Sequence, residues 1–118
     1  MGYSQPQART AVVALSAQID ATNAPDAGSD LLAAVVPGVT AVVADMTATR
    51  FCDAAGVSML AQVRQQAIVN LAELVLVVPS AAVLRALAAA GLDVMLPVYP
   101  SLAAALTPEP RPAAGATR

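Results

Sequence analysis

The sequence predicts an α/β domain with a single, mostly parallel or mixed β-sheet of roughly four to five strands and about four helices. Short apolar, β-branched runs alternate along the chain with segments of helical periodicity, which is the pattern of such a fold. A length of 118 residues suits one domain and is too short for two. With 58% hydrophobic and 12% charged residues, the composition supplies a core and is far from the disordered class.

The first strand is expected at Ala11–Ser16, a β-branched run. Residues 1–10 are polar and contain proline, so we expect a flexible lead-in or an edge strand there. Residues 17–20 are predicted to turn the chain. Asn23 then caps a helix that runs to about Val36, with a proline tolerated in its first turn.

The second strand is expected at Ala41–Met46, where continuous apolar character suits a parallel strand covered on both faces. Residues 47–52 connect it to a helix over Ala54–Val69, with Asn70 as a left-handed C-cap. This helix is expected to turn one face inward and another toward solvent. The inward face comprises Val57, Leu60, Ala61, Ala67 and Ile68, and the solvent face Ser58, Gln62, Gln65 and Gln66.

The last third of the chain adds a buried strand at Leu74–Val78 and a helix capped by Ser80 and stopped at Gly91. The residues of this helix expected to face inward are Val83, Leu84, Leu87 and Ala88. Met95–Tyr99 contains Pro97 and is therefore expected at a sheet edge. Ser101 caps a final short helix through Leu106, and residues 107–118 are expected to form a disordered tail rich in proline and alanine.

Several function classes are disfavoured by composition. The chain has no histidine and one cysteine, which removes Ser-His-Asp and Cys-His catalysis, nearly every zinc site and any disulfide within the chain. The eight acids form no paired motif. We therefore expect no enzyme, cofactor or metal site.

The composition also limits which partners and which cellular compartment we expect for this chain. The net charge is −2, and the basic residues are six scattered arginines without a basic stripe, so nucleic acid is not expected as a partner. The longest uncharged stretch, Val94–Pro108, is interrupted by prolines, so no membrane span is expected. A lone cysteine suits a reducing cytoplasm.

Five segments in order resemble the STAS domain of bacterial anti-sigma factor antagonists. An apolar strand ending in Asp45 is followed by Asp-Ala-Ala-Gly at 53–56, where that family has Asp-Ser-Ser/Ala-Gly opening a helix. Leu15–Asp20 resembles the family's Leu-Ser-Gly-Glu-Leu-Asp. Glu73–Ser80, and a helix that ends in Gly91-Leu92, continue the likeness over residues 11–106.

The resemblance implies a non-enzymatic protein that docks onto a serine-kinase-type anti-sigma factor and so regulates sigma-factor-dependent transcription. In that family the kinase phosphorylates the first Ser of the motif, a position that is Ala54 here and cannot accept phosphate. The expected docking surface combines the turn at 53–56, the exposed side of the following helix and the Asp20 loop. Its residues are Asp20, Asp53, Ala54, Ala55, Gly56, Ser58, Met59 and Gln62.

Several interpretations stay open beside this one. Asp53 also suits a helix cap and Gly56 close packing, and both roles are compatible with docking. Cys52 fits a small core residue better than a redox switch. The hydroxyls of Thr47, Thr49 and Ser58 are displaced phosphosites or, more simply, surface groups. The chain as a whole could instead be a scaffold or sensor subunit of a stress-signalling assembly, or a small-molecule or nucleotide-binding module; the oligomeric state is open.

Overall fold

A four-stranded parallel sheet forms the centre of the computed structural model, which describes residues 9–107. Its strands are β1 (Arg9–Ala14), β3 (Val39–Asp45), β5 (Glu73–Val77) and β6 (Val98–Tyr99), in that spatial order. Each neighbouring pair is parallel. The α/β class and the mostly parallel sheet are therefore confirmed, and β6 lies at the sheet edge as predicted. The strand is shorter than the predicted Met95–Tyr99, because Met95 ends a helix and Pro97 precedes the strand.

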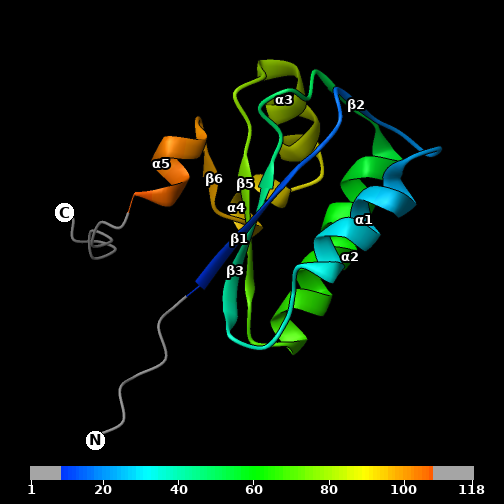
Figure 1. The fold of residues 1–118 in the computed structure, drawn as a ribbon. Helices are drawn as coiled ribbons and strands as arrows, with labels where there is room; N and C mark the ends of the chain where they lie inside the picture. The colour runs from blue at the N-terminus through cyan, green and yellow to red at the C-terminus, as the bar shows by residue number, and fades with distance from the viewer. Residues whose placement is uncertain (1–8, 108–118) are drawn as a thin grey trace, which may run out of the picture.

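Five helices in the described residues cover the two faces of this sheet unequally (Figure 1). One face carries α1 (Ala24–Ala33), α2 (Ala54–Val69), α3 (Ala81–Ala89) and the single turn α4 (Leu92–Met95). The other face carries α5 (Leu102–Leu106), which packs over β5 and β6. The larger part of the core therefore lies between the sheet and α1 to α3.

Side chains of the central strands alternate between these two faces, as the geometry of a strand requires. Leu74 and Leu76 of β5 point into the large core under the helices. Val75 and Val77 point to the other side, where Tyr99 and Leu102 cover them. A strand buried on both faces explains the continuous apolar run in the sequence.

A second, two-stranded sheet was not predicted. It pairs β2 (Gln18–Ile19) with β4 (Phe51–Cys52) in parallel, and we call it the ribbon. The interpretation of 17–20 as only a turn, and of 47–52 as only a connection, is therefore wrong in these positions. Two residues are too few to show the alternation that identifies a strand in a sequence.

Several predicted boundaries shift by a few residues. β1 begins at Arg9 and ends at Ala14, and α1 ends at Ala33 instead of Val36. α2 spans Ala54–Val69 as predicted, and Ser80 and Ser101 cap α3 and α5 through their hydroxyls as predicted. The remaining parts of the expected lead-in and tail, residues 1–8 and 108–118, lie outside the described residues.

The predicted left-handed cap at Asn70 is wrong by one residue. Asn70 has φ −98°, and its side-chain amide donates to the Gln66 carbonyl oxygen at 2.8 Å. The next residue, Leu71, adopts φ +62° with 87% of its surface exposed. The chain thus reverses at a leucine in a backbone region that disfavours side chains with a Cβ.

The predicted inward faces of α2 and α3 also need correction. Ile68 and Ala88 are exposed, and Leu84 is 36% exposed, although all three were expected inside. Val83 and Leu87 of α3 are buried as predicted.

In the part of the chain that the structure describes, no helix is both long and apolar enough to cross a membrane.

Candidate functional site

Two junctions between a strand and a helix lie side by side because the ribbon joins the strands that lead into them. Ile19 pairs with Cys52, and the Asp53 backbone N–H donates to the Ile19 carbonyl oxygen at 3.1 Å. Asp20 and Asp53 each follow one strand of this ribbon directly. The structure therefore brings together the two acids that the sequence placed on one surface.

Asp53 is the N-cap of α2. Its Oδ1 accepts hydrogen bonds from the backbone N–H groups of Ala55 at 2.9 Å and Gly56 at 3.1 Å. These are two of the N–H groups at a helix start that have no partner within the helix. The predicted capping role of Asp53 is confirmed.

Gly56 lies where α2 is pressed against the ribbon. A Cβ at this position would approach Cys52 Sγ to 2.6 Å and Ile19 Cγ2 to 2.8 Å, both closer than real Cβ contacts. The predicted role of Gly56 in close packing is confirmed. Because Gly56 is buried, it supports the surface above it and does not itself face solvent.

Ala54 is the first residue of α2, and its side chain is exposed. The following Ala55 is half-buried. Ser58 and Gln62 come one and two turns further along the helix and are exposed too. A stripe of three short or neutral side chains at 54, 58 and 62 therefore faces solvent beside Asp53.

Met59 was expected on this exposed side, and that expectation is wrong. Met59 is 6% exposed and packs against α1, where a Cβ on Gly28 would lie 3.0 Å from its Cγ. The reason is that α2 contacts both the sheet and α1, so its buried arc is wider than the single face that periodicity predicts.

The Asp20 loop holds its acid differently. Asp20 Oδ1 accepts from the Thr22 backbone N–H at 3.0 Å and the Thr22 hydroxyl at 2.6 Å, and these bonds lower the pKa of Asp20. Asn23 was predicted to cap α1, but its side chain makes no cap bond. Instead its Oδ1 accepts from Asp20 N–H at 2.9 Å, and its Nδ2 donates to the Gln18 carbonyl oxygen at 2.8 Å. Asn23 therefore ties the loop to the ribbon.

Cys52 is buried, as expected of a small core residue. Burial, and secondarily the charge of Asp53, raises the pKa of the Cys52 thiol to about 11. A buried thiol with a raised pKa carries little thiolate and reacts slowly with oxidants. This environment argues against the redox interpretation.

Three hydroxyls were considered either as alternative phosphosites or as surface groups. For Thr49 both interpretations are wrong. It is fully buried, and its hydroxyl donates to the Ser16 carbonyl oxygen at 2.7 Å, so it is neither a surface group nor accessible to a kinase. Thr47 is exposed and its hydroxyl donates to Asp45 Oδ1. Ser58 is exposed on α2.

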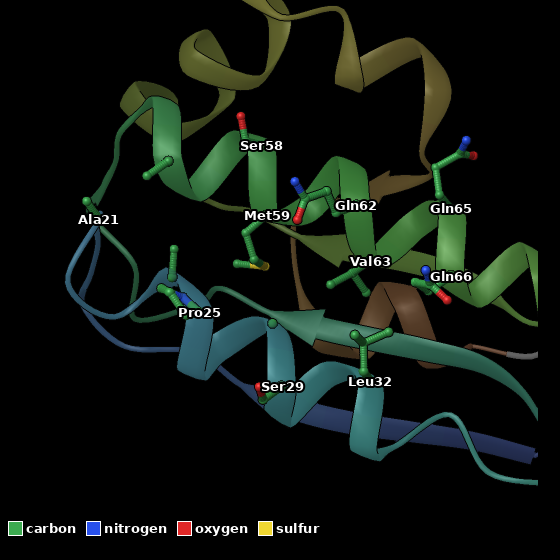
Figure 2. A pocket seen from close by; sticks show the side chains of 13 residues that line it. Ala21, Pro25, Ser29, Leu32, Ser58, Met59, Gln62, Val63, Gln65 and Gln66 are labelled. Atoms are coloured by element: carbon green, nitrogen blue, oxygen red, sulfur yellow. The ribbon is translucent and has the colours of Figure 1, made fainter.

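A groove between α1 and α2, with a volume of about 690 Å³, was missed by the sequence reasoning. We call it the α1–α2 groove. Met59 and Val63 point from α2 toward α1, while Leu32 points from α1 toward α2 (Figure 2). Gln62 and Gln66 line it one helical turn apart. A signal was present in the sequence: Gly28 stands inside a helix, where a small residue lets a neighbouring element approach.

The described residues, 9–107, contain no group of three or more His, Cys, Asp or Glu side chains placed to hold a metal ion. The two junctions offer groups for contact at the surface. They present two fixed carboxylates, a neutral helix start and an exposed helix face.

The structure is thus an α/β domain whose parallel sheet is covered by helices mainly on one face, with the α2 start capped by Asp53 beside the Asp20 loop. A family model of the STAS domain matches residues 4–105, so the chain belongs to the STAS domain family. This family is generally regulatory and non-enzymatic. A search of curated proteins finds no match to this chain.

Proposed function

We propose that this chain is an anti-sigma factor antagonist-like protein that docks onto a serine-kinase-type anti-sigma factor in the cytoplasm. By occupying that factor it regulates sigma-factor-dependent transcription, with no nucleic acid or membrane as a direct partner. The observation that supports the proposal is the exposed methyl of Ala54 at the start of α2, beside Asp53, in a STAS domain.

The docking surface consists of the exposed stripe of α2 together with the Asp20 loop. Ala54, Ser58 and Gln62 supply an uncharged face along two turns of helix, and Asp20 adds a fixed carboxylate held by Thr22. Asp53, Ala55, Gly56 and Met59 hold this face in place from beneath, so we assign them a supporting role within the predicted set. A partner that fits this surface presents a short apolar contact and a cation.

Position 54 also determines how the surface is regulated. A phosphate there would add roughly −1.5 to −2 charges at neutral pH, next to the carboxylate of Asp53. Such a charge would lose its hydration against a partner surface that accommodates a methyl group, and this cost would disfavour docking. Since Ala54 has no hydroxyl, the protein stays in its docking-competent form, and release depends on something other than phosphate at this position.

The test is calorimetric titration of the purified chain with candidate ATP-dependent anti-sigma kinases. Ala54→Asp places a charge on the docking surface and is expected to weaken binding by roughly tenfold or more. Ala81→Asp is the matched control, because Ala81 is likewise the exposed first residue of a helix, α3, and follows the N-cap Ser80. It should bind as wild type does.

A second variant separates docking from regulation. With the kinase and ATP, Ala54→Ser is expected to gain phosphate and lose affinity, while the wild-type chain gains none. If no candidate kinase binds the wild-type chain, the proposed function is wrong. If the wild-type chain is phosphorylated, only the constitutive form of the proposal fails.

A further inference from the structure

The α1–α2 groove adjoins the docking surface described above, and its lining shares Ser58 and Gln62 with that surface. Its volume of about 690 Å³ falls within the range of sites that bind small organic molecules, roughly 300–1,000 Å³. Gly28 keeps the groove open at its floor, because any side chain there would press on Met59. A side chain at position 28 would therefore displace Met59 and change the shape of the floor.

The lining of the groove defines what it can hold. Met59 and Val63 form an apolar floor, and Leu32 and Pro25 form an apolar wall from α1 (Figure 2). Leu32 is 38% exposed although it is a large apolar side chain. Burying this surface under a ligand with an apolar body would be favourable.

The polar groups of the lining carry no charge. Among the described residues that line the groove on α2, Gln62 and Gln66 offer side-chain amides, whereas the Ser58 and Gln65 side chains point away from α1 (Figure 2). The charged residues of the same helices, Asp26 and Asp30 on α1 and Arg64 on α2, are not part of the lining. An anion would find no cation here, and a cation would find no carboxylate.

We propose that the α1–α2 groove binds an uncharged small molecule with a mainly apolar body and one polar edge. The apolar body lies on Met59, Val63 and Leu32, and the polar edge faces the glutamine amides, which can each donate and accept a hydrogen bond. The absence of charge in the lining selects against nucleotides and other phosphates. The proposal goes beyond the docking function and does not depend on it.

The test uses two fluorescent probes of similar apolar size that differ in charge: Nile red, which is neutral, and 1-anilinonaphthalene-8-sulfonate, which is an anion. Nile red is expected to saturate one site per chain and to bind more tightly than the anion. Leu32→Glu puts a carboxylate into the wall and should weaken Nile red by roughly tenfold or more.

The matched control is Ala33→Glu, which adds the same charge at the neighbouring exposed position of α1 outside the lining. It should leave Nile red binding unchanged. Gln66→Glu places a carboxylate at a second lining position, which is exposed. A loss of Nile red binding in this variant therefore cannot come from a damaged core. Thermal melts of all three variants establish that they are folded.

Equal Nile red affinity for Leu32→Glu and wild type would overturn the inference, as would tighter binding of the anion.

A segment of the partner protein could instead be the occupant of the groove. In that case Leu32→Glu would weaken anti-sigma kinase binding as strongly as Ala54→Asp does, and this result would also overturn the inference. Failure of every kinase to bind would leave the probe result standing, so the two proposals fail separately.

Discussion

The two junctions on either side of the ribbon have the same order of parts and different chemistry. In each, a two-residue strand is followed by an aspartate and then a helix. Asp53 is itself the N-cap, so its carboxylate reaches the N–H groups of α2 directly. Asp20 stands three residues before the N-cap Asn23, and its carboxylate is used instead by Thr22.

The comparison shows that spacing decides what an acid does at a helix start. With no residue between acid and helix, the carboxylate fixes the helix and becomes part of the packed structure. With a short loop between them, it fixes the loop and remains at the surface. The first junction, at Asp20, therefore presents its acid at the surface, whereas the second junction, at Asp53, presents the helix that its acid holds. Four predictions examine this difference.

The largest effect is expected on thiol chemistry at the second junction. Because the Cys52 pKa is about 11, against an ordinary value of 9.0, its thiolate fraction near pH 8 is lower by about a hundredfold. Reaction with Ellman's reagent should accordingly be at least that much slower in the folded protein than in urea. Fast reaction of the folded protein would show that this junction is open, like the first.

Gly56→Ala tests how tightly the second junction is packed. The added methyl meets Cys52 Sγ and Ile19 Cγ2, and we expect a loss of about 2 kcal/mol in unfolding free energy by urea denaturation. The double variant Gly56→Ala with Cys52→Ala removes the nearest contact. It should therefore be less destabilised than the sum of the single variants. Simple additivity would show that the two side chains do not meet.

Asp53→Ala removes the cap of α2, and a loss of about 1 kcal/mol in unfolding free energy is expected. Asp53→Asn should retain most of that stability, because asparagine is an equally good cap. Thermal or urea unfolding of both variants gives the comparison. Equal losses in the two variants would mean that charge, not hydrogen bonding, matters at this position.

Asp20→Asn should have the smallest effect on stability, and one that depends on pH. The pKa of Asp20 in the folded protein is below its ordinary value of 3.8, so its carboxylate stabilises the fold above that pH. This contribution is lost as the pH falls through the folded-state pKa. The difference between wild type and Asp20→Asn should thus shrink below about pH 4. A difference that grows on acidification would contradict the assignment.

The sequence alone predicted those elements whose signals lie in their own or adjacent residues. The limits of α2 were predictable because Asp53 at its start and a long run of good helix formers coincide. The parallel sheet followed from strands that are apolar throughout. The position of β6 at an edge followed from Pro97.

What could not be predicted depends on contacts between distant segments. The hydroxyl of Thr49 is satisfied by Ser16, and no local pattern indicates that pairing. Met59 is buried only because α1 lies across α2 at Gly28. The α1–α2 groove needs both helices in place, so it becomes visible only in the folded structure.

The ribbon has a consequence for the order of events during synthesis. It joins Gln18 to Phe51, two positions separated by most of the first half of the chain. A nascent chain that ends before residue 51 has the Asp20 loop but lacks β4 and all of α2. The strand pair can form only after the loop between its strands is closed. The paired junctions therefore arise only after synthesis passes residue 52, and α2 is complete beside them only when residue 69 has been added.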